Sequence, residues 1–146
     1  MIENFFSAGE LIVQRLKATV QNVPDLNIRV APNQEWAIAN ALDKSIHVIF
    51  FDDQPETGKG GTSGRYVQQI STQYWLVVVS LKNVSNVGVA ARQDVGGLIV
   101  TVLQALQGHR LSKDHHELKR QRSPFRNPDK GGYIHIPLLF STSIII

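Results

Sequence analysis

The chain contains no cysteine among its 146 residues. This absence excludes disulfide frameworks, thiolate nucleophiles and zinc sites built on cysteine, and it fits a reducing compartment. No apolar run reaches the roughly 18 residues of a membrane span. The N-terminus carries Glu3 where a secretory signal would carry basic residues, so we expect neither a signal peptide nor a membrane location.

Charge is scarce as well. Charged residues make up 18% of the chain and apolar residues 42%, whereas soluble domains are typically about 25% charged. Residues 1–64 carry five basic and eight acidic side chains, and residues 65–146 carry ten basic and four acidic ones. Oppositely charged halves suit head-to-tail contacts between copies, and they also suit nucleic-acid binding. Composition alone leaves both open.

The apolar spacing predicts one α+β domain over residues 1–146. Period-3.6 patterns predict an amphipathic helix over 3–20 and a longer helix over 89–107 that ends at Gly108. Asn33 is expected to cap a short helix. Patterns rich in β-branched and aromatic residues predict strands over 26–30, 45–51, 66–81, 117–121 and 133–146. This order favours a mainly antiparallel, mixed sheet with two principal helices on one face.

Two segments predict contacts beyond the core. Residues 55–65 contain four glycines and are expected to form the tip of a β-hairpin. The following strand is polar in its first half and apolar on both faces in its second, so the hairpin should project from the domain. Gly96 and Gly97 each cost about 1 kcal/mol in a helix, which predicts close packing of the backbone against the sheet or a neighbouring subunit.

The C-terminal strand carries two further signals. Pro137 cannot donate a ladder hydrogen bond, so it indicates an edge strand or a bulge. The chain ends in Ile144, Ile145 and Ile146. An apolar edge with this ending would aggregate unless a partner covered it. We therefore expect association with other molecules here.

Candidate catalytic and metal sites fail on spacing. Lys59 is followed by Gly60, so the glycine-rich stretch lacks the Walker A pattern. Asp52 and Asp53 should point to opposite faces of a strand and end it at a solvated turn. The cluster Asp114 to Glu117, with two histidines, lacks metal-ligand spacing and is expected to be a solvated basic loop. We expect no catalytic residue, cofactor or metal.

A basic run covers residues 119–130 and contains Phe125. Basic side chains with aromatics among them are typical of nucleic-acid surfaces. Only one aromatic lies within this run, so a charged loop at a protein interface is the favoured interpretation. Direct nucleic-acid binding stays a rival hypothesis.

An ordered series of features from about Tyr66 to Thr142 resembles the tail terminator, or tail completion, proteins of bacteriophages, particularly those of Mu-like prophages. The series consists of the strand 73–79, Ala91-Arg92, Gly96-Gly97, Ala105-Leu106 with Gly108, a loop at Pro124, a turn at Gly131-Gly132, and 136–142. The N-terminal third matches only in its opening helix.

The resemblance implies a structural virion protein, not an enzyme. It implies a homohexameric ring at the head-proximal end of the tail, made in the host cytoplasm, that caps the tail tube, stops its polymerisation and offers a surface for head joining. The implied partners are other copies, the tail tube protein and a neck or head-completion protein, with the tail sheath left open. A head-completion or neck adaptor is the alternative within the phage setting.

The residues expected to carry these contacts are basic, polar or apolar side chains on the arm, the long helix, the basic loop and the last strand. They are Arg65, Tyr66, Gln68, Gln73, Arg92, Arg120, Arg122, Arg126, Phe140, Ile144, Ile145 and Ile146.

Overall fold

The computed structural model describes the backbone of residues 2–21, 23–56, 70–82, 88–125, 129–130 and 132–145. The glycine-rich stretch, the expected hairpin tip and the first part of the following strand lie outside the described residues. Across those residues, no helix combines the length and the apolar composition that a membrane crossing needs.

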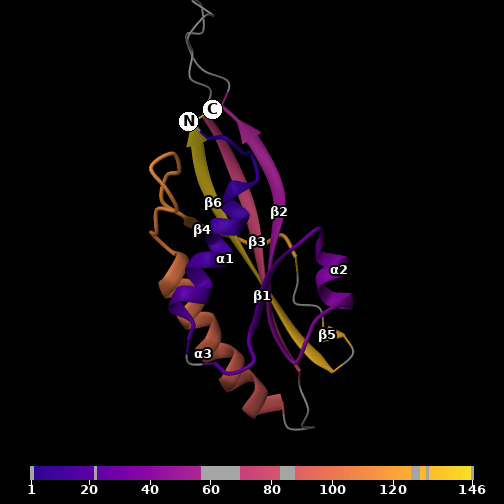
Figure 1. The fold of residues 1–146 in the computed structure, drawn as a ribbon. Helices are drawn as coiled ribbons and strands as arrows, with labels where there is room; N and C mark the ends of the chain where they lie inside the picture. The colour runs from indigo at the N-terminus through magenta and orange to yellow at the C-terminus, as the bar shows by residue number, and fades with distance from the viewer. Residues whose placement is uncertain are drawn as a thin grey trace, which may run out of the picture.

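In the described residues the fold is α+β, with three helices and a six-stranded, mostly antiparallel sheet (Figure 1). Chain order gives α1 (Ser7–Thr19), β1 (Asn27–Ala31), α2 (Gln34–Ala39), β2 (Lys44–Pro55), β3 (Ile70–Lys82), α3 (Gly88–Leu106), β4 (Lys119–Gln121), β5 (Asp129–Lys130) and β6 (Tyr133–Ile145). The strands lie in the order β1-β2-β3-β6-β4, and β5 pairs with the start of β6. Among these described strands, β1 and β2 form the one parallel pair, and the other pairs are antiparallel. This confirms the predicted fold class.

The two faces of the sheet carry different helices. In β3, Trp75, Val77 and Val79 belong to the larger core cluster, which also contains apolar residues of α1 and α3. The alternate residues Leu76 and Val78 face the other way and belong to a smaller cluster with the α2 side. Both faces of β3 are therefore buried, as its continuous apolar run predicts. The two principal helices share one face, as expected (Figure 1).

Helix α1 packs through a stripe with helical spacing. Ala8, Ile12 and Leu16 have no exposed surface, and burying residues of this kind stabilises a fold by roughly 1.5–3 kcal/mol each for the larger side chains. The helix begins at Ser7, later than the expected residue 3. Gly9 lies directly against the ring of Trp75, where a β-carbon would come within 2.7 Å of Cζ3.

Helix α3 ends as the sequence predicts. Gly108 adopts φ of +78°, a conformation that favours glycine. The mid-helix glycines behave differently from the expectation. A β-carbon at Gly96 or Gly97 would meet no described atom within 4 Å. The predicted close approach to the sheet is therefore wrong, and contact with a neighbouring subunit stays a prediction.

Strand β6 is an inner strand rather than a bare edge. It pairs with β3 along its length and with β4 over residues 139–141. Pro137 lies between the segments that pair with β5 and β4, where β6 has no second neighbour among the described residues. The missing N–H of Pro137 is tolerated at such a place.

The chain covers part of its own C-terminus. Ile144 has no exposed surface, pairs with Ser71 and forms a bridge with His115. The expectation that the terminal isoleucines need a partner to cover them is thus wrong for Ile144. Ile145 is half-buried and Ile146 lies outside the described residues. Contacts between copies therefore need surfaces other than Ile144.

Candidate interaction surfaces

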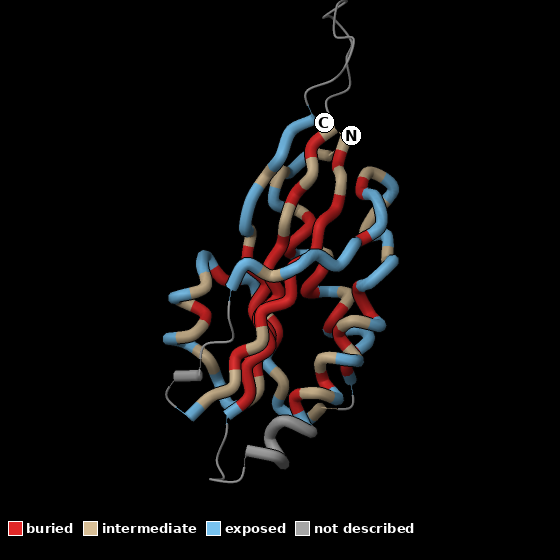
Figure 2. Tube along the Cα trace, turned by 180° about the vertical axis from the view of Figure 1, so that it is seen from behind, coloured by how far each residue is buried: buried red, intermediate tan, exposed pale blue. Residues whose placement is uncertain are grey.

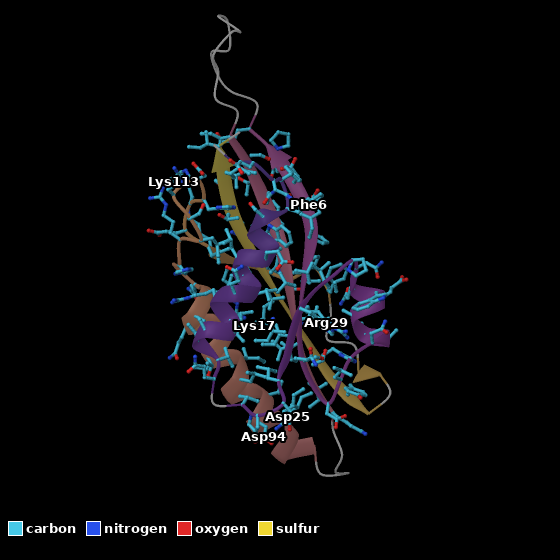
Figure 3. All side chains as sticks on the ribbon, in the orientation of Figure 1. Phe6, Lys17, Asp25, Arg29, Asp94 and Lys113 are labelled. Carbon is cyan, nitrogen blue, oxygen red and sulfur yellow. The ribbon has the colours of Figure 1, made fainter. Side chains whose placement is uncertain are left out.

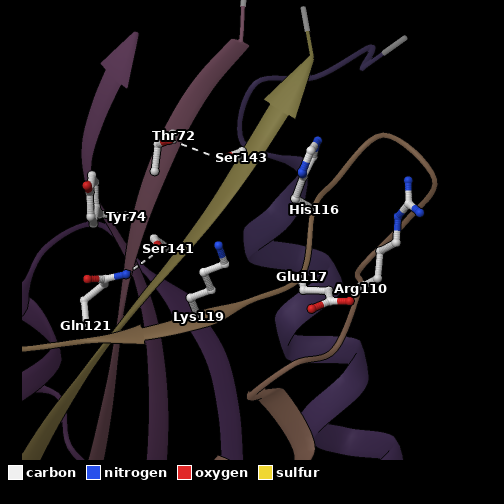
Figure 4. A pocket seen from close by; sticks show the side chains of 9 residues that line it. All are labelled: Thr72, Tyr74, Arg110, His116, Glu117, Lys119, Gln121, Ser141 and Ser143. Atoms are coloured by element: carbon white, nitrogen blue, oxygen red, sulfur yellow. Dashed lines mark hydrogen bonds between the residues drawn. The ribbon is translucent and has the colours of Figure 1, made fainter. Parts of the chain in front are cut away.

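A polar groove of about 460 Å³ lies on the α2 side of the sheet, beside β4 (Figure 4). Its floor consists of side chains from β3 and β6, and its wall comes from β4 and the segment before it. The lining residues are Thr72, Tyr74, Arg110, His116, Glu117, Lys119, Gln121, Ser141 and Ser143. These residues are up to 71 positions apart in the chain, so the groove is not visible as a sequence motif.

The hydroxyl groups of the groove are held by neutral partners. Thr72 Oγ1 and Ser143 Oγ lie 3.2 Å apart, and Gln121 Nε2 donates to Ser141 Oγ at 2.9 Å (Figure 4). A nucleophilic hydroxyl needs a neighbouring base such as histidine or a carboxylate. Neither serine has such a hydrogen-bond partner among the described residues.

The loop between α3 and β4 is organised by Arg110. Its guanidinium donates to the carbonyl oxygens of Ser112, Lys113 and His115 at 3.1, 2.7 and 2.8 Å. This one side chain satisfies three backbone acceptors that a tight loop would otherwise leave to water. Lys113 extends from this loop at one side of the molecule (Figure 3). Nothing in the sequence pattern marks Arg110 for this role, so it could not be predicted.

The histidines in this loop differ. His115 is buried, and its Nδ1 lies 2.6 Å from Ser112 Oγ. Burial lowers the pKa of His115, and the nearby Asp114 opposes that shift. The expectation of a solvated loop is wrong for His115, whereas His116 is exposed. Within the described part of the chain, no three histidine or carboxylate side chains gather in a metal-binding group.

The segment after β4 crosses the α2 side of the sheet. Phe125, at its end, packs edge-on against Phe51 of β2 with ring centroids 5.5 Å apart. From behind, this exposed segment passes in front of the buried strands (Figure 2). Phe125 is thus already engaged within the chain. This leaves less of its ring free for stacking on a base, as nucleic-acid binding would use it.

Each of the two edges of the sheet has a stretch of strand without a partner strand on its outer side, among the described residues. Strand β2 pairs with β1 only as far as Ile49, and it continues to Pro55 with one neighbour among the described residues. Asp52 and Asp53 lie on this free stretch and pair with Tyr74 and Gln73. They face opposite sides as expected, but they do not end the strand.

The opposite edge is basic. Strand β4 contains Lys119 and Arg120, Arg122 follows it, and all three are exposed. Strand β4 pairs with β6 and has no strand on its other side in the described ranges. The first part of the basic run seen in the sequence therefore lies at an open sheet edge.

The predicted interface residues do not form one surface. Gln73 and Phe140 have no exposed surface, like Ile144. Gln73 Nε2 donates to the carbonyl oxygen of Phe5, and its Oε1 accepts from Trp75 Nε1. These three side chains belong to the core, so they do not form part of an exposed interface.

Arg120 and Arg122 lie together at the β4 edge. The described residues do not include Arg65, Tyr66, Gln68, Arg126 or Ile146, nor the side chain of Arg92.

Comparison with protein families decides the kind of protein. The family model described as phage tail terminator protein matches residues 1–146. The chain belongs to the phage tail terminator family. It is therefore a structural protein of phage tails, and the resemblance seen in the sequence extends over its whole length.

A solved structure supports the same fold for this terminator family member. A chain in the virion of a native gene transfer agent particle superposes with a TM-score of 0.56 at 14% sequence identity. The match covers 99% of this chain and 100% of that one. No curated protein matches the sequence. At such low identity the likeness concerns the fold alone.

Proposed function

We propose that copies of this chain form a ring that caps the finished tail tube, stops its polymerisation and presents a surface for joining the head. The observation that carries this proposal is the family match over residues 1–146. Two free sheet edges of unlike charge support it, because a closed ring needs two different, complementary surfaces on each subunit. A hexamer and a head-proximal place in the virion are part of the proposal.

Association can be tested by adding the purified protein to tail tube protein during polymerisation. We expect tubes to stop growing, and to carry at one end a particle whose mass is about six times that of the 16.3 kDa chain. Tubes of unchanged length with no bound protein would contradict the proposal. Binding at a tube end without any effect on growth would favour a neck adaptor instead.

A further inference from the structure

We infer that neighbouring copies in this ring join edge to edge, with the free stretch of β2 in one copy pairing with β4 of the next and Asp52 facing Lys119. The inference rests on the proposed ring. It adds to that proposal a defined contact, a strand direction and a register.

The first of the two pairing edges is the stretch of β2 beyond Ile49. From Phe50 to Pro55 its outer side has no partner strand among the described residues. The register shifts between Phe50 and Asp52, so Phe51 is an extra residue in a β-bulge. Bulges and charged side chains on an edge discourage indiscriminate pairing between sheets. This edge is therefore suited to a partner of matching shape and charge.

The second pairing edge is β4. Just before β4, Leu118 still pairs with the segment that follows α3. The Gly108 N–H donates to the carbonyl oxygen of Leu118, and the Leu118 N–H donates to the carbonyl oxygen of His109. From Lys119 to Gln121 no described strand pairs with its outer side. All three residues of the strand are exposed. A strand this short adds few hydrogen bonds, so side-chain charges must contribute to the contact.

The two edges lie at the same level along the strand direction, because one row of directly paired residues connects them. Tyr74 pairs with Asp52 on one side and with Ser141 on the other, and Ser141 pairs with Lys119. Directly paired residues point to the same face of a sheet. Asp52, Tyr74, Ser141 and Lys119 thus form one row across four strands. A neighbouring copy at the same height continues that row by placing its Asp52 beside Lys119.

The strand directions also agree. Strands β2 and β3, β3 and β6, and β6 and β4 are antiparallel pairs, so β4 runs opposite to β2. Rotation about an axis parallel to the strands preserves direction. It therefore brings β4 of one copy against β2 of the next as an antiparallel pair, the commoner arrangement of adjacent strands.

Charge favours this contact over its alternatives. Asp52, Asp53 and Glu56 lie at the β2 edge, and Lys119, Arg120 and Arg122 lie at the β4 edge. Neither Asp52 nor Lys119 forms an ion pair with another described residue. Two β2 edges would bring carboxylates together, and two β4 edges would bring cations together. Only the head-to-tail arrangement pairs opposite charges, and that arrangement closes rings.

Disulfide trapping tests the contact directly, because the natural chain has no cysteine. The variant Asp52→Cys/Lys119→Cys places one thiol on each edge, at a spacing typical of paired strands. After assembly on tail tubes and mild oxidation, we expect a ladder of covalent multimers ending in a closed ring. Each single variant, and Lys17→Cys/Lys119→Cys with one thiol on α1, should give no ladder.

Three results separate this inference from the proposed function. Capped tubes without cross-linked multimers would overturn the edge contact and leave the cap intact. A protein that never associates with tubes would count against the cap itself. A ladder from the Lys17 control as strong as that from the Asp52 pair would mean collision and not a defined interface, and would also overturn the inference.

Charge exchange provides a second, independent measurement. Lys119→Glu should weaken association between copies about tenfold, and Asp52→Lys should do the same. The combined variant Asp52→Lys/Lys119→Glu restores opposite charges across each contact and should recover most of the association. Sedimentation velocity at low salt measures the effect. If the combined variant loses as much as both single variants added together, Asp52 and Lys119 do not face each other.

Discussion

At the scale of single residues, the α2 side of the sheet contains several buried polar side chains, among them His47, Ser80 and His135. His47 has no exposed surface and accepts a hydrogen bond at Nε2 from Arg29 Nε at 2.9 Å. Arg29 lies on β1 (Figure 3), and its guanidinium lies 4.8 Å from the ring centre of Trp36 on α2. On β6, His135 Nδ1 lies 2.7 Å from Ser80 Oγ. Because its ring is buried beside the Arg29 guanidinium, His47 fits this layer in its neutral form.

His47 makes stability depend on pH. Burial, then the charges of Arg29 and His135, lower its pKa from 6.5 to about 4. Between these values the unfolded chain binds a proton that the folded chain does not, so acid destabilises the fold. The loss should begin as pH falls below 6.5, be complete below pH 4, and reach at most about 3 kcal/mol.

Urea denaturation at pH 7, 5 and 4 measures this dependence. His47→Gln keeps an acceptor for Arg29 but cannot titrate, so the gap between the two proteins isolates His47. We expect the variant to lose less stability on acidification than the natural chain. Equal losses in both proteins would show that His47 does not contribute.

Gly9 is required by its contact with Trp75. In Gly9→Ala the new β-carbon would lie 2.7 Å from Trp75 Cζ3, and the buried ring is held by its hydrogen bond to Gln73. Alanine gains about 1 kcal/mol of helix propensity, whereas overpacking costs about 1–3 kcal/mol. We expect a net loss of about 1 kcal/mol in chemical denaturation. Glu10→Ala, at an exposed neighbouring position, should show no such loss.

At the scale of elements, α3 carries a glycine pair that its own chain does not explain. Gly97 is exposed, and Val100, one turn later, is 52% exposed. Gly97→Ala should therefore stabilise the isolated chain by about 0.5–1 kcal/mol. If this face packs against a neighbouring copy, the same change should reduce ring formation.

Thermal unfolding and sedimentation measure the two effects on the same sample. Lys17→Ala on α1 is the matched change at an exposed helical position outside the proposed contact. A more stable Gly97→Ala protein that assembles normally would show that the pair serves no interface. A less stable one would show that the glycine is needed within the chain.

The elements that could be predicted from sequence are those with a local signal. Apolar spacing located α1 and α3, Asn33 caps α2 by accepting from the Trp36 N–H at 2.8 Å, and Gly108 ends α3. Strand neighbours have no local signal. The place of β6 beside β3, the burial of Gln73 and Ile144, and the bulge at Phe51 all depend on pairing across long sequence separations. A sequence pattern gives alternation along a strand but not the identity of its partner.

At the scale of the whole molecule, the charge asymmetry of the sequence becomes a spatial one. The acidic stretch of β2 and the basic β4 lie at opposite edges of the sheet (Figure 1). The unlike charges of the two halves can be read from the sequence, but their places on two edges of the sheet, in the same row of paired residues, cannot. That placement follows from the order of strands, which only the fold provides.

Tail length tests the central claim most directly. Electron microscopy of particles made by the encoding phage or prophage, with and without this gene, gives the distribution of tail lengths. If the protein stops polymerisation, its loss should yield overlong tails without heads, and restoring it should return tails of one length. Tails of normal length that merely lack heads would contradict termination and indicate a role in head joining alone.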